Sequence, residues 1–292
     1  MVPMKGAASD KMILDAHTHV FPSEVCSHRE DFFPDEPAFR LLYESPKSVL
    51  VSPPEMLSYL DEEGVEMAVI CGFPWRQERL WRRHNEVILE TARRWPQRFV
   101  AFCAVDPLEP GALREVERCL AEGARGVGEL AWYAEDPGED LITPLGPIAE
   151  LCQHYGVPLM LHTNDPIGAP YPGKANISLS ALYRLIKTFP EVTWIMAHFG
   201  GGLPFYGLLK KEVPDIFQRV YFDTAASPYL YRSAIYRLVT EMVGPEKILF
   251  GSDYPLLPVK RYLKELAEAD VPEDVQEMIL GKNLAGLLGG RH

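Results

Sequence analysis

The sequence predicts a (β/α)8 TIM barrel of the α/β class, built as a single domain over residues 1–292, with its site at the C-terminal face of the strands. Eight short apolar runs rich in β-branched and aromatic residues alternate with longer segments of helical periodicity. Near-continuous apolar strands separated by helices indicate a parallel sheet that is covered on its outer face. A length of 292 residues suits one barrel, a fold of about 250 residues.

The predicted strands follow one another along the whole chain. They are Met12–His17, Glu66–Phe73, Phe99–Val105, Ala124–Leu130, Val157–Thr163, Val192–His198, Val220–Ala225 and Lys247–Asp253. Apolar residues at helical spacing predict helices over Trp81–Trp95, Gly111–Glu122, Ile148–Tyr155, Leu179–Phe189 and, at the C-terminus, Val271–Leu288. An open, doubly wound sheet is the alternative. The glycine-rich phosphate turn that would favour it is absent after the first strand.

Two irregular stretches follow predicted strands, Phe21–Pro54 after the first and Tyr133–Pro144 after the fourth. Long loops inside a domain are often lids or binding loops. Both would project from the carboxyl face, where barrel enzymes keep their sites. We therefore expect residues 21–54 to be a loop or lid insertion.

Composition excludes several classes of function. A net charge of −12 with scattered basic residues argues against a nucleic-acid partner. No apolar stretch approaches the roughly 20 residues of a membrane helix, and the first residues lack the apolar core of a signal peptide. Five separated cysteines without a CxxC pair suggest reduced thiols and a cytoplasmic protein. The expected partner is a small-molecule substrate, and a homodimer is left open.

Histidines and a carboxylate gather at the ends of the predicted strands. His17 and His19 end the first strand, where side chains two residues apart share a face. His162 ends the fifth strand, His198 the sixth and Asp253 the eighth. All five would meet at one rim of a barrel. Imidazole and carboxylate suit Zn²⁺ and related ions, so the pattern predicts a divalent-metal centre.

Glu129 ends the fourth predicted strand and is a further candidate for the site. Its carboxylate could bridge two ions, or it could hydrogen-bond a ligand histidine without touching the metal. Asp15 and Asp223 are weaker candidates for the same supporting role.

With these motifs in order, the sequence resembles the amidohydrolase superfamily. The resemblance rests on His17-x-His19, His162, His198 and the run from Phe250 to Pro255, and it spans nearly the whole chain. The most similar branch is the amidohydrolase-related one that includes barrel decarboxylases such as aminocarboxymuconate-semialdehyde decarboxylase.

The resemblance implies that His17, His19, His162 and Asp253 bind metal, and that His198 binds a second ion or acts as a catalytic electrophile. Binuclear members often carry a carbamylated lysine after the fourth strand, but no lysine occurs between Lys47 and Lys174. Glu129 at that place is similar to the bridging glutamate of TatD-type nucleases. Because the chain lacks the basic patch of a nuclease, one ion, most simply Zn²⁺, is the default expectation, with two left open.

The function expected first is hydrolysis of an amide, ester or lactone bond by metal-activated water, with Asp253 as general base and acid and His198 stabilising the oxyanion. Substrate-binding candidates are side chains that follow the strands: Trp75, Arg76, Trp132 and Asn164, with Phe73, Tyr133 and Asp165 as weaker ones. Aromatic groups at a pocket mouth suggest a partly apolar or cyclic substrate.

Two other functions compete with hydrolysis. A metal-dependent decarboxylase of an aromatic or enol-type acid would use the same ligands, with Arg76 or Arg40 as a cation for the substrate carboxylate. A non-catalytic barrel with a structural metal is the second rival. Structural zinc sites are usually closed by four ligands and often use cysteine, unlike the His and Asp set here.

Overall fold

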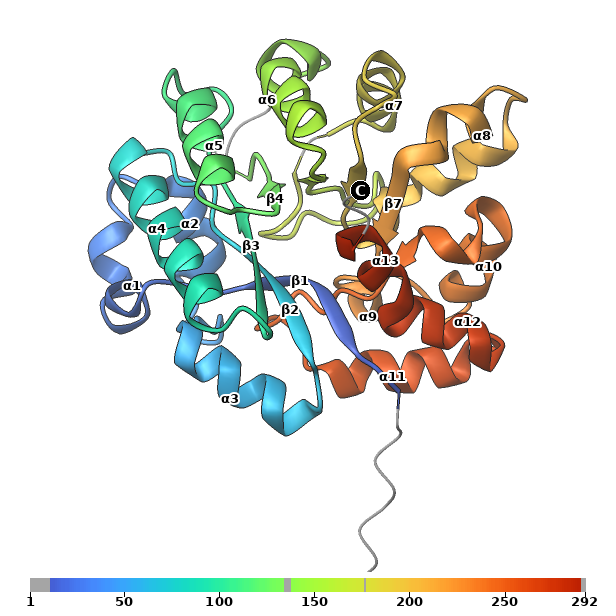
Figure 1. The fold of residues 1–292 in the computed structure, drawn as a ribbon, viewed down its shortest axis with the longest axis horizontal. Coiled ribbons are helices and arrows are strands. Elements are labelled where there is room, and N and C mark those ends of the chain that lie inside the picture. The colour runs from blue at the N-terminus through green and yellow to red at the C-terminus, as the bar shows by residue number, and fades with distance from the viewer. Residues whose placement is uncertain (1–10, 134–137, 176, 290–292) are drawn as a thin grey trace, which may run out of the picture.

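The computed structural model describes residues 11–133, 138–175 and 177–289, and in it eight parallel strands lie in the order β1 to β8. Figure 1 shows the helices surrounding the strands, with the colour running around the ring from blue to red. The strands are β1 Leu14–His19, β2 Met67–Cys71, β3 Phe99–Cys103, β4 Gly126–Leu130, β5 Leu159–Leu161, β6 Trp194–Met196, β7 Val220–Asp223 and β8 Ile248–Leu249. The prediction of a (β/α)8 barrel is confirmed.

The two ends of the sheet are joined just beyond β8. Ala16 N donates to Phe250 O at 2.7 Å, Asp253 N donates to His17 O at 2.9 Å, and His19 N donates to Tyr254 O at 2.8 Å. The barrel is therefore closed by the segments that carry predicted metal ligands, so closure and site assembly depend on the same hydrogen bonds.

The described helices cover the outside of the barrel and its rim. They are α1 Ser23–Ser27, α2 Pro37–Tyr43, α3 Pro53–Glu63, α4 Glu78–Arg94, α5 Ala112–Ala121, α6 Ile142–Tyr155, α7 Leu179–Thr188, α8 Val213–Ile216, α9 Ser227–Leu230, α10 Ile235–Val243, α11 Val259–Glu268, α12 Glu273–Glu277 and α13 Asn283–Gly289. The predicted C-terminal helix runs without a break from Glu273 to Gly289, with a π-helical turn over Met278–Lys282 between α12 and α13.

Two sequence expectations about loops need correction. The segment 21–54 is not irregular throughout, because it carries α1, a 3₁₀ turn and α2. Helix α6 begins six residues before the predicted start, since Asp140 Oδ1 accepts the backbone N–H groups of Ile142 and Thr143 at 3.0 and 3.1 Å. Proline is tolerated in a first helical turn, so Pro144 does not delay the helix. Residues 134–137 of the predicted loop lie outside the described residues.

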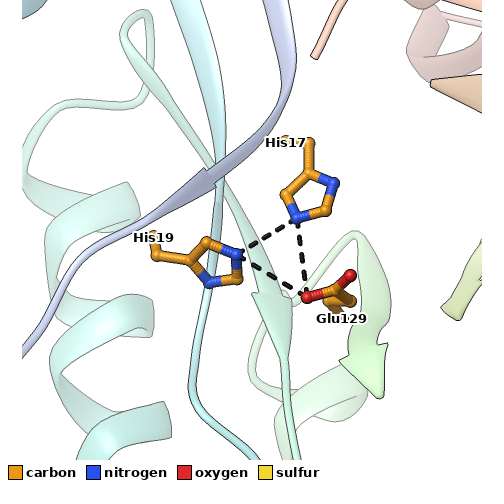
Figure 2. A group of neighbouring side chains, drawn as sticks. All are labelled: His17, His19 and Glu129. Carbon is orange, nitrogen blue, oxygen red and sulfur yellow. Dashed lines mark hydrogen bonds and ion pairs between the residues drawn. The ribbon is translucent and has the colours of Figure 1, made fainter. Parts of the chain in front are cut away.

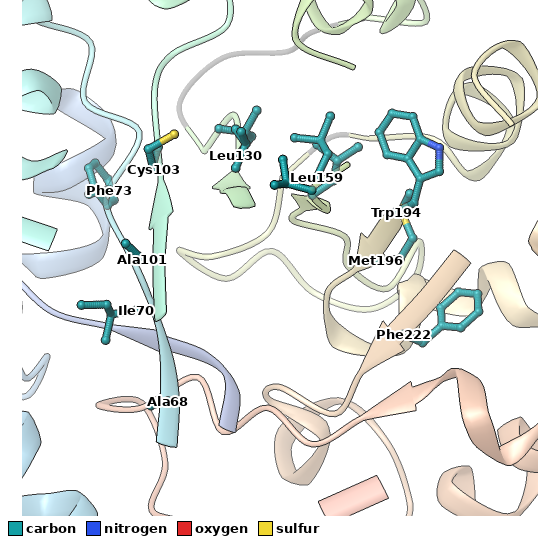
Figure 3. Close-up of a cluster of buried hydrophobic side chains, with 14 of the residues drawn as sticks. Ala68, Ile70, Phe73, Ala101, Cys103, Leu130, Leu159, Trp194, Met196 and Phe222 are labelled. Atoms are coloured by element: carbon teal, nitrogen blue, oxygen red, sulfur yellow. The ribbon is translucent and has the colours of Figure 1, made fainter. Parts of the chain in front are cut away.

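Two hydrophobic clusters pack against the two faces of the sheet. The larger one joins the strands to the surrounding helices, and Figure 3 shows part of it, including Ile70, Leu159 and Trp194. The smaller one lies inside the barrel and contains buried strand residues such as Val69, Met160 and Ile195. With these layers packed on both faces, the strand ends form a rigid base for the side chains above them.

Candidate metal centre

His17 and His19 come from the end of β1 and face the same space. Their Nε2 atoms are 3.1 Å apart, and Figure 2 shows both rings turned toward Glu129. The parallel pairing of β1 with β2 shifts register between Asp15 and Thr18, a bulge-like irregularity at the ligand motif. Bulges next to active sites commonly re-aim a side chain. The predicted pairing of the two imidazoles is found.

Glu129 reaches this space from β4, whose pairing with β5 shifts register between Val127 and Leu130. Val127 and Leu130 both belong to the cluster between the sheet and the helices although they are three residues apart, so strict alternation is broken between them. With Leu130 facing the helices, Glu129 faces the barrel interior. Its Oε2 lies 3.6 Å from His17 Nε2 and 3.7 Å from His19 Nε2.

His162 and His198 meet the other oxygen of the same carboxylate. Glu129 Oε1 is 2.9 Å from His162 Nδ1 and 3.3 Å from His198 Nε2, and those two nitrogens are 3.1 Å apart. Two groups of donor atoms therefore share Glu129. In each group the donor atoms lie within 4.8 Å of one another.

Asp253 completes the group on the side of β1. Its Oδ1 lies 3.2 Å from His19 Nε2 and 3.7 Å from His17 Nε2. The side chain of Asp253 is 16% exposed, whereas that of Glu129 is 3% exposed. Asp253 and the 13% exposed His19 thus mark the open side of the site.

Hydrogen bonds from the outer ring nitrogens fix the ring orientation of three of the histidines. His17 Nδ1 donates to Asp223 Oδ2 at 2.8 Å, which leaves Nε2 facing the centre. His198 Nδ1 donates to Ala225 O at 3.0 Å, and His162 Nε2 donates to Gly173 O at 2.9 Å. A carbonyl only accepts, so these bonds fix both rings with His198 Nε2 and His162 Nδ1 directed inward. Such outer partners typically orient metal-binding histidines.

Asp223 also fixes the position of His198, the predicted ligand that follows β6. Its Oδ1 accepts the backbone N–H of His198 at 2.8 Å and that of Ala225 at 3.0 Å, and the residue is fully buried. His198 itself has a positive φ of 56° and begins a left-handed turn through Gly202. Asp223 therefore positions two predicted ligands, His17 from β1 and His198 after β6.

The charges of the side chains in the centre favour a bound cation. Burial opposes ionisation of Glu129, but the imidazoles of His17 and His162 outweigh it and hold the pKa of Glu129 well below its usual range. Burial likewise opposes ionisation of Asp253, yet His19 and His17 lower the pKa of that carboxyl. Although burial opposes it, the carboxylates around them raise the pKa of His17 and of His198, so positive charge on the imidazoles balances the negative charge of the centre. A divalent ion coordinated by these groups can supply that positive charge instead, so the residues present fit a metal.

An aromatic wall borders the centre. The hydroxyl of Tyr133 donates to Glu129 Oε2 at 3.2 Å, and its ring meets His162 edge-on at 5.0 Å. Phe73 lies nearly parallel to Tyr133, with ring centroids 6.1 Å apart, and Tyr43 of the 21–54 segment contacts Phe73 at 6.0 Å. Burial and the nearby carboxylates hold the pKa of Tyr133 well above its usual value, so this phenol stays protonated.

The four predicted substrate-binding side chains lie at different depths. Trp75 is buried against Phe39 and donates from Nε1 to His84 at 3.0 Å. Asn164 is buried, and its Oδ1 accepts Ala175 N at 2.8 Å.

Trp132 is buried, whereas Arg76 is exposed and its backbone N–H bonds Glu36. Among the described residues, no hydrogen bond, ion pair or ring contact joins these four side chains to the predicted metal-binding histidines. Their role in substrate binding stays a prediction.

A family model described as amidohydrolase matches residues 14–289. The chain belongs to this family. It is 24% identical over 251 residues to γ-resorcylate decarboxylase from Rhizobium radiobacter, covering 68% of this chain and 75% of that relative.

Solved structures share the fold. That of 5-carboxyvanillate decarboxylase from Sphingomonas paucimobilis has a TM-score of 0.75 and 20% identity, covering 96% of this chain and 99% of the other. The structure of dihydroxybenzoic acid decarboxylase from Polaromonas sp. JS666 contains bound manganese and the inhibitor 2-nitroresorcinol. It has a TM-score of 0.70 and 19% identity to this chain, and the match covers 97% of this chain and 98% of the other.

These comparisons correct the first functional expectation. The prediction of an amide, ester or lactone hydrolase is wrong, because the relative and the two solved structures named above are decarboxylases of aromatic acids, the function that stood as its alternative. They support a divalent-metal site, while zinc itself stays a prediction. Within the described part of the chain, no helix has both the length and the apolar character needed to cross a membrane.

Proposed function

We propose that this protein is a metal-dependent decarboxylase, a carbon–carbon lyase that acts on an aromatic or enol-type carboxylic acid. The observation that carries the proposal is a buried His and carboxylate centre with one open side, bordered by the rings of Tyr133 and Phe73. Such walls suit a planar substrate, since rings gain from packing on rings. The similarity to aromatic-acid decarboxylases points to the same class of substrate.

The ion would be held on the β1 side by His17, His19, Asp253 and Glu129. When bound, it supplies a Lewis acid for the carboxylate and any neighbouring hydroxyl of the substrate. The imidazole-rich ligand set favours Zn²⁺, whereas the manganese of the Polaromonas structure makes Mn²⁺ the second ion to test.

The structure bears on how the substrate carboxylate is recognised. The side chain of Arg40 is 57% exposed and pairs with Glu44 at 2.7 Å, and Arg76 is exposed as well. Neither arginine is therefore proposed as the cation for the substrate. We assign that role to the metal centre, on which the substrate carboxylate would lie beside Tyr133.

Asp253 and His198 are the proposed catalytic residues. Decarboxylation breaks the bond between the ring and the carboxyl carbon, releases CO₂, and leaves an electron pair that takes up one proton at the ring carbon. Asp253 is the carboxylate on the open side, and His19 and His17 keep it ionised, so it would first take up a proton from water and then deliver that proton to the ring carbon. His198, whose ring is oriented by the bond from Nδ1 to Ala225 O, would hold the substrate oxygen or pass a proton taken from water to Asp253.

The test is release of CO₂ from ¹³C-carboxyl-labelled acids by protein loaded with Zn²⁺ or Mn²⁺. The panel would contain hydroxybenzoates with the carboxyl beside the hydroxyl, and enol-type dicarboxylates. We expect metal-dependent release that is lost in Asp253→Asn and His198→Asn and kept in His154→Asn, an exposed histidine on α6. Folded, metal-loaded protein that releases no CO₂ from any member would refute the proposal.

A further inference from the structure

Tyr43, the last residue of α2, extends the aromatic wall that borders the metal centre. We propose that its hydroxyl binds an uncharged oxygen substituent of the substrate ring, and that Tyr43 thereby selects hydroxylated over unhydroxylated acids. The inference rests on the proposed function, because it takes the substrate carboxylate to lie on the metal centre. It adds a contact at the opposite end of the substrate.

The first argument is the order of the rings along the wall. Tyr133 is beside the centre, because its hydroxyl donates to Glu129 Oε2 at 3.2 Å. Phe73 lies 6.1 Å from Tyr133 between ring centroids, and Tyr43 lies 6.0 Å from Phe73. Among the described residues, no hydrogen bond, ion pair or ring contact joins Tyr43 to a predicted metal ligand or to Tyr133. A planar acid bound through its carboxylate and packed on Phe73 would therefore direct its far edge toward Tyr43.

The second argument is that the hydroxyl of Tyr43 is available. The side chain is half-buried, and no hydrogen bond of its hydroxyl is found within the described part of the chain. Burial raises the pKa of this phenol, and the carboxylates of Asp253 and Glu129 raise it further, so the group stays protonated. The effect of these two carboxylates also indicates that the hydroxyl faces the same space as the metal centre. A protonated phenol there can donate to a ligand oxygen.

The third argument concerns the charge of the bound substituent. Phe21 and Phe39 pack against the ring of Tyr43, with centroids 5.2 and 5.0 Å from it. Burying a charged group among such rings costs free energy unless a cation pairs with it. A second carboxylate would also be repelled by Asp253 and Glu129, which act on the same hydroxyl. A ring hydroxyl avoids both costs and can still accept the hydrogen bond.

The fourth argument is that the backbone around Tyr43 is held in place. Arg29 is the cation whose charge acts on the Tyr43 hydroxyl, and its guanidinium is bound to the backbone. Its Nη1 donates to Ser48 O at 2.7 Å and to Tyr43 O at 3.4 Å. The hydroxyl of Ser48 in turn donates to Leu42 O at 2.7 Å. These bonds fix the turn that follows α2.

The buried Glu36, the N-cap residue of α2, fastens this helix to the connection that follows Phe73. Its two carboxylate oxygens accept the backbone N–H groups of Arg76 at 2.8 Å and of Gln77 at 3.0 Å. Tyr43 is therefore carried by a helix that is attached to the wall at both ends. A binding residue needs such support from its surroundings to discriminate between ligands.

The test is isothermal titration of the metal-loaded protein with salicylate and with the four dihydroxybenzoates that carry one hydroxyl more than salicylate. Tyr43→Phe removes the hydroxyl and keeps the ring. We expect it to weaken binding of at least one dihydroxybenzoate about three- to tenfold and to leave binding of salicylate unchanged. In CO₂ release, KM for that dihydroxybenzoate should rise by the same factor, with kcat changed less than about twofold.

Tyr183→Phe is the matched control. Tyr183 on α7 also packs on aromatic rings, and no hydrogen bond of its hydroxyl is found among the described residues. Its loss should change none of these affinities. Circular dichroism checks that both variants fold.

Two results would overturn the inference. One is a wild-type protein that binds salicylate as tightly as every dihydroxybenzoate, which needs no variant. The other is a folded Tyr43→Phe protein with wild-type affinity for each acid. Neither result touches the proposed reaction if the wild type releases CO₂. A protein that binds none of these acids also overturns the inference, and it refutes the proposed function as well when no CO₂ is released from the enol-type acids.

Discussion

Replacing Asp223 by asparagine should weaken metal binding without unfolding the barrel. The carboxylate is fully buried; its Oδ2 accepts from His17 Nδ1 at 2.8 Å, and its Oδ1 accepts the backbone N–H of His198 at 2.8 Å. Asparagine has the same size and can keep the Oδ1 bonds. It then places an NH₂ group, which only donates, opposite His17 Nδ1.

His17 must respond by moving its ring proton. If Nδ1 accepts from the new amide, the proton goes to Nε2, which lies 3.1 Å from His19 Nε2 and should bear a lone pair for the metal. If the amide flips instead, its NH₂ group faces the N–H groups of His198 and Ala225, and two buried hydrogen bonds are lost. Loss of such an outer partner typically costs 10- to 100-fold in metal affinity, about 1.4–2.7 kcal/mol.

The assay is competition between the protein and a chromophoric chelator for Zn²⁺ or Mn²⁺, with far-ultraviolet circular dichroism to confirm the fold. Asp61→Asn is the matched control, because Asp61 is 62% exposed and pairs with Arg98 at 2.5 Å, away from the ligands. We expect a Kd at least tenfold weaker in Asp223→Asn and unchanged in the control. A folded Asp223→Asn protein with the wild-type Kd would refute the role assigned to this carboxylate.

Three further predictions concern the stability of the fold and the rate of the proposed reaction. Burial lowers the pKa of His84 from 6.5 to about 4, so the unfolded chain binds the extra proton first as pH falls. The contribution of His84 to stability should therefore drop by about 3 kcal/mol between pH 6.5 and 4, measured in urea unfolding as the difference in pH dependence between the wild type and His84→Gln. Gly201→Ala should destabilise the fold by at least about 1 kcal/mol, since φ is +61° and its Cβ would lie 2.2 Å from a backbone oxygen. Gly207→Ala, with its nearest atom at 3.4 Å, should be nearly neutral in the same denaturation experiment. Tyr133→Phe removes the hydrogen bond to Glu129 and should lower kcat/KM for CO₂ release about tenfold, with the metal still bound. An unchanged kcat/KM would show that this bond does not serve the reaction.

The sequence predicts the barrel and most of the centre because both depend on local patterns. Apolar runs separated by amphipathic helices specify the strands, and polar residues at their carboxyl ends must share one rim. His17, His19, Glu129, His162 and His198 therefore come together as expected, and Asp253 joins them.

Other features depend on contacts between distant segments. The register of β4 against β5 shifts between Val127 and Leu130, an irregularity around Glu129 that the apolar pattern of the strand does not predict. The carbonyl of Gly173, which orients His162, lies in a loop without a distinctive motif. Its role follows only from the folded structure.

Reaction type could not be predicted from the ligands. The same imidazoles and carboxylates can activate water for hydrolysis or bind the carboxylate of an acid that loses CO₂. The two reactions differ in the shape and the lining that they need in the space beside the metal centre. The rings of Phe73 and Tyr133 reach that space from the ends of two strands.

The most direct measurement of the central claim is an anomalous-difference map from crystals of the purified protein grown with Zn²⁺. We expect an anomalous peak for Zn²⁺ about 2 Å from the Nε2 atoms of both His17 and His19, beside Asp253 and Glu129. Crystals that contain Zn²⁺ at saturating concentration and show no anomalous peak among these four side chains would contradict it.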